Sequence, residues 1–503
     1  MKTLFKPTSY KKGAALAIGA TFVWKTISFA NALLLALYFG ASRQTDVYFY
    51  LIILTGVGVA FLQRLNQTVL IPEAMFLTQQ DKTTGQKFAT MWLYIYVALG
   101  IVVCLISVGC PEQIWRVLSR FGEKLLAHDR ALLMWALWVF ALQIITYYLI
   151  AVAEMYKFFK TAWLGVLNAI CPLAALLLFG SHVGIISMLY GFFIADVLQI
   201  IILLALLKTQ MNWTFRPAWI PLRTRTRQNM LTGQTLAVLD VVNSWLPLYL
   251  MSGMGAGLVS ALNYCKQLTD STTEVFTARV ANVAKIEITE QIAKKELGKA
   301  NVSFVSYSYI LLVILAPLVV FSCYFAPYIV ELFFKRGQFT AQAAHDTILF
   351  LRPMLFVLLL SVPGYLQNSA LAAGQKIKEW FPYALTSGLI FTAMMWFFIP
   401  KQGAFVYPYL IGAGLVVGFI LNAFLFKKHL NFMQYFQPLR LVARFTALAV
   451  IALVPAALLS CVLAKNCWIQ IFGCGCVFVA AYAGILYLTK DMWQLRQFFR
   501  NNF

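Results

Sequence analysis

The chain has 503 residues, of which 61% are hydrophobic, 15% aromatic and only 12% charged, and its mean hydropathy is +0.77. Soluble proteins carry roughly 25% charged residues, and half of that charge cannot cover a surface that faces water. The composition therefore excludes a soluble globular protein, a disordered chain and a secreted disulfide scaffold. It indicates a polytopic membrane protein.

Apolar segments follow one another along the whole chain. They lack the alternation of barrel strands and reach the roughly 20 residues that a membrane-spanning helix needs. The first of them follows the basic residues 1–12 and contains Lys25, so we interpret it as a span and not as a cleavable signal peptide. We expect an all-α protein with about fourteen transmembrane helices, at 13–40, 45–78, 88–110, 131–156, 161–181, 183–207, 229–254, 256–284, 301–334, 347–373, 379–400, 404–426, 445–464 and 467–489.

The net charge of +22 is distributed unevenly across the predicted membrane. Most of the 40 Lys and Arg residues fall in segments on the same side as the N-terminus. This bias predicts that both termini lie in the cytoplasm. It also explains the basicity by topology and contact with anionic lipids, without nucleic-acid binding. The nine cysteines and four histidines lack the spacing of a metal or redox site, so we expect no bound metal.

Two sequence stretches recur at nearly the same offset, which indicates an internal repeat. Residues 38–48 resemble 254–264, and residues 151–157 resemble 370–376, each pair at corresponding span junctions. Six spans separate the copies, so the repeat is parallel and predicts two lobes around a central cavity, as in alternating-access transporters. We expect a first lobe at 1–207 (spans 1–6), a cytoplasmic linker at 208–228, a second lobe at 229–426 (spans 7–12), and spans 13 and 14 with a cytoplasmic tail at 427–503.

Charged side chains within the spans concentrate in spans 1, 2, 7 and 8, which are equivalent pairs under the repeat. Lys25 lies in the middle of span 1, and Arg64 interrupts span 2. A charge at this depth costs about 2.5–3.5 kcal/mol, so it usually faces a cavity or a partner. Lys25 is the strongest candidate for contact with a ligand. Arg64 has the alternative of reaching the interface from the end of a kinked span.

Spans 7 and 8 carry further polar residues at helical spacing. In span 7 they offer oxygen ligands for Na⁺ or pack together as a polar cluster: Asp240, Asn243 and Ser244. In span 8 a charged stripe follows one helical face and either binds a ligand or neutralises itself in a structural core: Lys266, Asp270 and Glu274. Asp196, Glu154 and Arg352 are more isolated, and for these we favour local structural pairing.

Cationic groups in a membrane cavity suit an anionic ligand such as a phosphate. The sequence has no P-loop, zinc-protease motif or nucleophile elbow, so we expect a transporter without a cofactor and not an enzyme. Transport would then be driven by Na⁺, by H⁺ or by the membrane potential.

Two further stretches carry a family resemblance. Phe39-Gly-Ala-Ser-Arg-Gln-Thr-Asp46 resembles the junction of the first two helices in the MurJ (MviN) lipid II flippases, and Leu332-Phe-Phe-Lys-Arg-Gly-Gln-Phe-Thr340 resembles an outer-loop motif of that family. The family belongs to the multidrug/oligosaccharidyl-lipid/polysaccharide exporter superfamily. The resemblance implies flipping of an undecaprenyl-pyrophosphate-linked sugar precursor, with the head group in the cavity and the lipid tail in a groove formed by spans 13 and 14.

The resemblance also assigns residues in the first two spans. Lys25 stands where the family has a cavity arginine, and Asp46 matches the family's aspartate. Asn31 stands at the position of a second cavity arginine and carries no charge.

In spans 2 and 8 the match to the family is looser. Arg64 loosely matches a helix 2 arginine, and Gln267 stands at a helix 8 arginine with Lys266 beside it. A pocket with fewer arginines can suit a different lipid-linked glycan.

We therefore hypothesise a flippase in the bacterial inner membrane that moves a polyprenyl-pyrophosphate-linked saccharide outward by alternating access. Lipid II is the leading candidate. In this scheme Lys25, Arg64 and Lys266 attract the pyrophosphate. Acidic side chains bind sugar or peptide groups or a coupling ion: Asp240, Asp270 and Glu274.

Four alternatives stay open at this point. Two are transporters: a flippase for capsule, exopolysaccharide or O-antigen units, and a cation-coupled multidrug exporter. The other two are a membrane scaffold and an integral-membrane glycosyltransferase. The expected partners are the lipid-linked glycan, membrane lipids and the machinery of cell-wall or polysaccharide synthesis.

Overall fold

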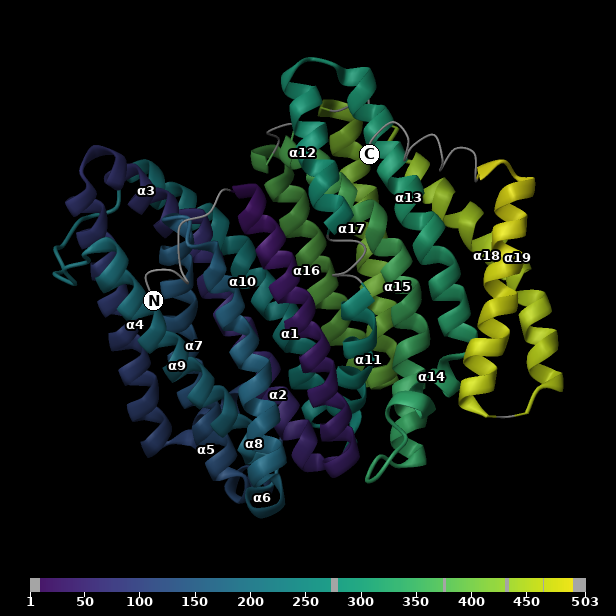
Figure 1. Cartoon of the computed structure of the whole chain (residues 1–503), viewed down its shortest axis with the longest axis horizontal. Coiled ribbons are helices and arrows are strands. Elements are labelled where there is room, and N and C mark those ends of the chain that lie inside the picture. The colour runs from purple at the N-terminus through teal and green to yellow at the C-terminus, as the bar shows by residue number, and fades with distance from the viewer. Residues whose placement is uncertain (1–9, 273–278, 374–376, 430–433, 465, 492–503) are drawn as a thin grey trace. The chain divides into compact units, whose positions relative to one another are not determined.

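The computed structural model describes residues 10–272, 279–373, 377–429, 434–464 and 466–491. Every regular element within these ranges is a helix (Figure 1), which confirms the all-α prediction. Thirteen helices in this part of the chain are long and apolar enough to cross a membrane. They coincide with all the predicted spans except the eighth, at 256–284.

The predicted eighth span consists of two shorter helices in its described parts. These are α11 (Leu258–Thr272) and α12 (Arg279–Ala293). Residues 273–278 between them, which include Glu274, lie outside the described residues. The charges of α11 that singled out this span in the sequence also make it less apolar than the thirteen others.

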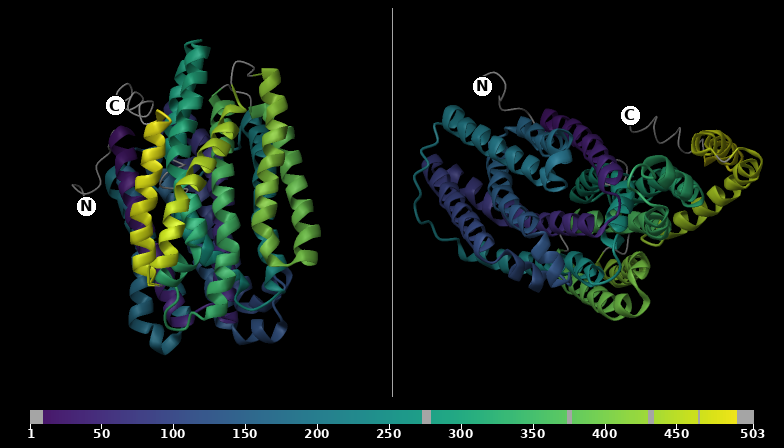
Figure 2. Two further views of the ribbon diagram at one scale, coloured as in Figure 1. Left: turned by 90° about the vertical axis from the view of Figure 1, so that its right-hand side faces the viewer. Right: turned by 90° about the horizontal axis from the view of Figure 1, so that it is seen from below.

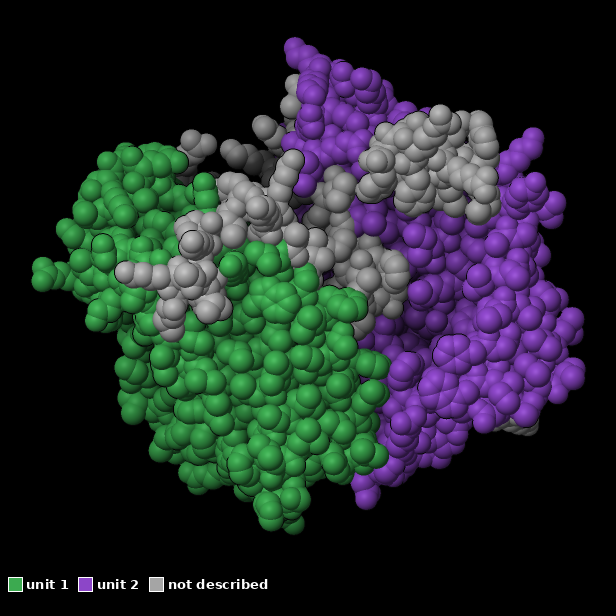
Figure 3. Space-filling view, viewed as in Figure 1, with its two compact units in different colours: residues 1–260 green, residues 261–503 purple. Residues whose placement is uncertain are grey.

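The chain divides into two compact units, residues 1–260 and 261–503, coloured green and purple in Figure 3. Unit 1 includes α10, which is the first span of the predicted second lobe. The division of the chain into two lobes was inferred from the sequence repeat, and it stays a prediction. The predicted linker at 208–228 is partly helical, because α9 continues to Met211 and α10 begins at Thr224.

The described residues of unit 1 form ten complete α-helices, a π-helical turn (η1) and a 3₁₀ segment (η2). In chain order they are α1 (Tyr10–Phe39), α2 (Arg43–Leu65), η1 (Asn66–Leu70), α3 (Ile71–Gln80), α4 (Lys82–Gly109), α5 (Pro111–Leu118), α6 (Glu123–His128), α7 (Arg130–Met155), η2 (Phe159–Val166), α8 (Leu167–Val183), α9 (Ile186–Met211) and α10 (Thr224–Ser252).

Local sequence explains where two of these helices begin. Ser42 caps α2 in a reciprocal pair of hydrogen bonds with Thr45. Asp81 caps α4 by accepting hydrogen bonds from the side chains and backbone of Thr83 and Thr84, which hold the pKa of Asp81 well below its usual range. Ser42 lies shortly before the predicted span at 45–78, whereas Asp81 begins α4 earlier than the predicted span at 88–110.

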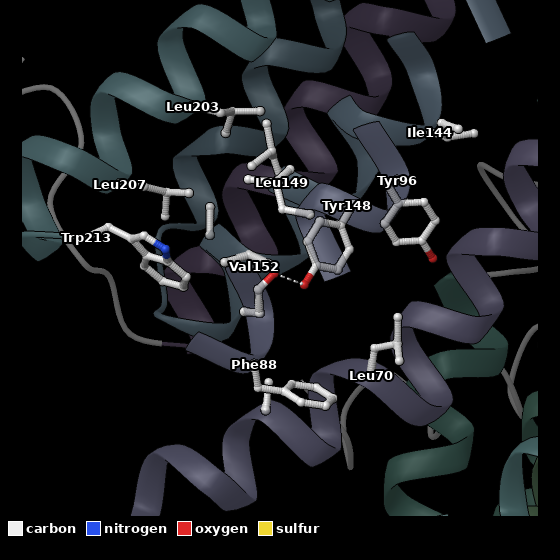
Figure 4. Close-up of a cluster of buried hydrophobic side chains, with 14 of the residues drawn as sticks. Leu70, Phe88, Tyr96, Ile144, Tyr148, Leu149, Val152, Leu203, Leu207 and Trp213 are labelled. Carbon is white, nitrogen blue, oxygen red and sulfur yellow. Dashed lines mark hydrogen bonds between the residues drawn. The ribbon is translucent and has the colours of Figure 1, made fainter. Parts of the chain in front are cut away.

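The core of unit 1 lies where α4, α7 and α9 pack together (Figure 4). Tyr148 of α7 is buried there, and its hydroxyl donates to the carbonyl oxygen of Ala89 at 2.7 Å. Tyr96 donates in the same way to the Asn66 side chain at 2.7 Å and so joins α4 to η1. These bonds satisfy phenol groups that have no water to bind inside the unit.

The connection between α9 and α10 is attached to unit 1 by a buried carboxylate. Glu73 of α3 is 2% exposed and accepts two hydrogen bonds of 2.7 Å from the Arg223 guanidinium and one of 2.6 Å from Thr226. The guanidinium also lies 3.6 Å from the centre of the Phe76 ring. These contacts therefore fix the start of α10 to α3.

Unit 2 contains the remaining helices. They are α11 beyond residue 260, α12, α13 (Leu297–Tyr324), α14 (Ala326–Phe333), α15 (Ala341–Ala373), α16 (Ile377–Gln402), the 3₁₀ turn η4 (Ala404–Val406), α17 (Tyr407–His429), α18 (Gln437–Val462), the π-helical turn η5 (Ile469–Gly473) and α19 (Cys474–Leu488).

The last two spans, α18 and α19, lie side by side at the end of the chain (Figure 2). Asp491, which is fully buried, joins them to α13. It accepts hydrogen bonds from Arg444 of α18 at 2.8 Å, from Tyr309 of α13 at 2.7 Å and from Thr489 at 2.5 Å. Spans 13 and 14 are thus firmly attached to unit 2, although they lie outside the repeat.

We expect Glu73→Ala to release the start of α10, because the substitution leaves Arg223 and Thr226 without their acceptor. Trypsin should then cleave after Arg223 faster than in the parent protein, since cleavage requires local unfolding of the backbone. Glu123→Ala, which breaks an exposed ion pair with Arg116, is the matched control. Equal cleavage rates for the two variants would contradict the anchoring role of Glu73.

Candidate functional site

An ion pair between α2 and α10 lines a polar cavity of unit 1. Arg64 donates from Nη1 to Oδ2 of Asp240, and their side chains are 45% and 63% exposed. The cavity measures about 340 Å³. Its walls are formed by polar and apolar side chains in comparable numbers: Arg64, Asp240, Gln63, Gln67, Ser244, Val57, Ala60, Phe61, Ala237 and Val241.

Arg64 owes its position to a change in helix geometry. It lies in the last turn of α2, and the π-helical turn η1 follows directly before the chain continues as α3. Such π-turns interrupt the regular hydrogen-bond ladder and often occur at functional sites. The span that Arg64 was predicted to interrupt is therefore one continuous helical segment with a π-turn beside the charge.

The ion pair bears on the predicted Na⁺ site at Asp240, Asn243 and Ser244. Ser244 lines the same cavity as Asp240, and Asn243 is half-buried on the same helix. The Asp240 carboxylate, however, already has a guanidinium as its partner. A cation at Asp240 would have to compete with Arg64, so this arrangement does not favour an ion there.

Two predicted site residues of α1 have different surroundings. Lys25 is half-buried, and its Nζ lies 4.8 Å from the centre of the Trp24 ring. Asn31 is buried, and its side-chain amide donates to the carbonyl oxygen of Ala169 in α8 at 2.9 Å. Six residues correspond to about 120° around a helix, so Lys25 and Asn31 point to different sides of α1. Asn31 joins two helices of unit 1.

Asp46 lies at the centre of a hydrogen-bonded contact with the turn between α10 and α11. It is 1% exposed and accepts bonds from the backbone N–H of Gly257 at 2.6 Å and of Ser260 at 2.8 Å. The Ser260 hydroxyl donates to it at 2.7 Å, and Arg43 donates to the carbonyl of Met254 at 3.0 Å. We call these contacts the Asp46 clamp.

The clamp requires glycine at position 257. Gly257 has a φ of +88°, and a Cβ there would lie 2.8 Å from the carbonyl oxygen of Ala41. A side chain would be excluded both by the backbone conformation and by this close approach.

The two sides of the clamp are the two copies of the sequence repeat, at 38–48 and 254–264. Both stretches are recognisable in the sequence as a repeat, but Gly257 and Ser260 were not predicted to be functional residues. The repeat itself was the signal, because it aligned the turn of Gly257 with the stretch that contains Asp46.

The remaining predicted site residues belong to unit 2. Lys266 is half-buried, with its Nζ 5.9 Å from the centre of the Tyr407 ring, while Gln267 is half-buried and Asp270 is exposed. Glu274 lies outside the described residues. The convergence of these side chains with Lys25 and Arg64 on one cavity stays a prediction.

Unit 2 also has two apolar cavities along α18 that sequence reasoning did not locate. One of about 640 Å³ lies between α15 and α18, and one of about 580 Å³ also borders α13 and α14. Phe356 and Val450 line both cavities, which we therefore call together the α15–α18 groove. Arg352 at its edge donates to the Cys323 carbonyl oxygen at 3.3 Å. The groove has no sequence signal, because its apolar residues resemble those of any lipid-facing helix.

We expect Asp46→Ala to destabilise the protein by about 1–3 kcal/mol, because it leaves the N–H groups of Gly257 and Ser260 and one hydroxyl without an acceptor. Thermal unfolding in detergent should show a lower midpoint than the parent protein. Glu123→Ala removes an exposed carboxylate and should change the midpoint little. A shift no larger than that of Glu123→Ala would show that the clamp contributes nothing to stability.

Comparison with known proteins places the chain in a family. Residues 35–478 match the family described as lipid II flippase MurJ. A curated relative, the probable lipid II flippase MurJ of Borreliella burgdorferi, is 21% identical over 369 residues, which are 71% of this chain and 72% of the relative.

Solved structures show the same fold. A lipid II flippase MurJ in an inward closed conformation matches 95% of this chain and 99% of its own with a TM-score of 0.79 at 16% identity. An inward-facing multidrug resistance transporter of the MATE family matches 82% of this chain and 99% of its own with a TM-score of 0.65 at 13% identity. The family match, which covers most of the sequence, confirms the resemblance and makes the protein a flippase-type transporter and not an enzyme. The chain belongs to the MurJ family of lipid II flippases.

Proposed function

We propose that this protein moves lipid II, the lipid-linked precursor of peptidoglycan, from the inner to the outer leaflet of the bacterial cytoplasmic membrane by alternating access. The family match over residues 35–478 is the observation that carries the proposal. The cationic side chains at membrane depth support it, since a pyrophosphate in a low-dielectric cavity needs positive partners.

Arg64 and Asp240 form the first part of the proposed site. Without substrate, the Asp240 carboxylate balances the guanidinium and so avoids an unpaired charge in the membrane. A pyrophosphate carries more negative charge than a carboxylate, so it can take over Arg64 while the site stays compensated. Both side chains are about half exposed to the cavity, which makes this exchange sterically open.

The other predicted residues have separate roles in this proposal. Lys25 and Lys266 add positive charge for the pyrophosphate, and Gln267 offers an amide to its oxygens or to a sugar. Asp270 and Glu274 bind polar groups of the sugar or peptide. Asn31 and Asp46 position helices and do not touch the substrate, because each is buried and bonded to neighbouring backbone.

Alternating access would involve the Asp46 clamp. The charge bias of the sequence predicts that residues 38–48 and 254–264 lie at the outer surface, with both termini in the cytoplasm. Opening the protein to the outside would then break the hydrogen bonds of Asp46, so the clamp stabilises a state closed on that side.

We further propose that the α15–α18 groove holds part of the polyprenyl tail. The cavity between α15 and α18 is lined by apolar side chains and Thr446, and the second cavity adds Arg352 and Ser460 at one end. The family resemblance implies a groove formed by spans 13 and 14, and of these two spans only span 13 (α18) lines the α15–α18 groove. The tail can then remain in hydrocarbon while the head group crosses. Peptidoglycan synthesis enzymes that release or consume lipid II are the expected partners.

We expect Lys25→Ala to abolish flipping, since it removes the positive charge of span 1 that we propose attracts the pyrophosphate. The test is complementation: the resident lipid II flippase of a bacterium is depleted, the variant is expressed, and lipid II exposed on the outer leaflet is measured. Lys124→Ala, at an exposed position of α6, is the matched control.

Each outcome of the complementation has a distinct meaning. Lipid II exposure restored by the parent chain and by Lys124→Ala, but not by Lys25→Ala at equal membrane abundance, supports both the function and the site. Normal exposure with Lys25→Ala contradicts the role of Lys25. Failure of the inserted parent chain contradicts lipid II as substrate and favours another lipid-linked glycan, in keeping with the uncharged Gln267.

Asp240→Asn and Arg64→Gln should act in opposite directions on ligand binding. Removing the competing carboxylate should tighten binding of undecaprenyl pyrophosphate about two- to fivefold, which corresponds to one exposed ion pair. Removing the guanidinium should weaken binding. The measurement is a titration of the purified protein in detergent. Weaker binding in Asp240→Asn would show that Asp240 contacts the ligand and does not compete with it.

A further inference from the structure

A buried carboxylate in unit 1 has no positively charged partner among the described residues. Asp196 of α9 is completely inaccessible to solvent, and neither of its side-chain oxygens accepts a hydrogen bond from the described residues. Asp196 is the eleventh residue of a 26-residue span, so it lies near the middle of the membrane. An ionised carboxylate at this depth costs several kcal/mol unless a positive charge is close by.

Oxygen-bearing side chains of three helices surround this carboxylate. Asn168 of α8 and Thr146 of α7 lie next to it. Gln199, one turn further along α9, donates from Nε2 to Oδ1 of Asn168 at 2.7 Å. The hydroxyl oxygen of Thr146 and the amide oxygen of Gln199 are themselves buried without a partner.

The charges around the cluster do not balance. Within the described residues, no Lys, Arg or His forms an ion pair with Asp196. The other titratable side chains beside it are Tyr147 and Cys171, which are neutral or negative and cannot compensate a carboxylate. Asp240, by contrast, is half exposed and paired with Arg64.

We propose that Asp196, Asn168, Thr146 and Gln199 form a binding site for a monovalent cation, with Na⁺ as its ligand. Hard cations prefer carboxylate, amide and hydroxyl oxygens, and these are the groups that lack partners here. The single negative charge of the cluster matches a single positive charge. A divalent ion would leave one uncompensated charge in the middle of the membrane.

The site would fix α7, α8 and α9 to one another, since its ligands come from all three helices. It is separate from the Arg64 cavity, and the inference does not depend on the proposed substrate. A cation that binds the folded protein stabilises it in proportion to occupancy. Stability can therefore report on the site in the absence of any lipid substrate.

The test is thermal unfolding of the purified full-length chain in detergent, without lipid II. Increasing NaCl is compared with choline chloride at the same ionic strength, which separates specific binding from screening. The midpoint should rise with Na⁺ and saturate. Asp196→Asn, which keeps the side-chain shape and removes the charge, should abolish the rise.

Two further variants define the site. Thr146→Val replaces the hydroxyl with a methyl group of similar size and should raise the half-saturating Na⁺ concentration about tenfold. Glu154→Gln neutralises an exposed carboxylate of the same helix and should leave the Na⁺ response unchanged. If Asp196→Asn does not fold, Thr146→Val still tests the proposal.

Three results would overturn the inference. They are a parent protein without a Na⁺-specific shift, an unchanged Na⁺ response in both Asp196→Asn and Thr146→Val, and loss of the response in Asp240→Asn alone. A Na⁺-dependent midpoint in a chain that fails to flip lipid II would leave the cation site intact and contradict only the proposed function.

Discussion

Every charge placed at membrane depth needs a compensating partner, because the bilayer offers no water to solvate it. Most of the informative contacts of this protein answer that requirement. Arg64 pairs with Asp240 across a cavity. Just beyond the end of the last span, the buried Asp491 accepts hydrogen bonds from Arg444 and from a tyrosine hydroxyl. Asp196 differs from both, because its buried carboxylate has no positively charged partner among the described residues. We assign these three carboxylates to different roles: Asp240 to substrate exchange, Asp491 to structural attachment and Asp196 to cation binding.

The exposure of each pair indicates whether it can be exchanged. Arg64 and Asp240 are both about half exposed, so a charged ligand can reach and replace one partner. Asp491 is buried beneath its donors and can only hold helices together. A flippase needs both kinds of contact, since the head-group site must release its ligand while the helices around it keep their packing.

The Asp46 clamp joins the two copies of the sequence repeat. The copies at 38–48 and 254–264 do not merely occupy equivalent places; they bind each other through Asp46, Gly257 and Ser260. A contact between repeat copies can be broken and re-formed without unfolding either copy. This property suits a protein that alternates between two states.

The helical membrane fold, thirteen of the spans and the family can be predicted from the amino-acid sequence, because hydropathy over about 20 residues and short motifs are local properties of the chain. The sequence also selected Lys25, Arg64, Asp46 and Asp240 as special. Their partners depend on the tertiary structure, since Arg64 meets Asp240 across 176 residues and Asp46 meets Ser260 across 214. The amino-acid sequence specifies the charge of each residue and its position along the chain, whereas the partner of a charge depends on which distant helices pack together.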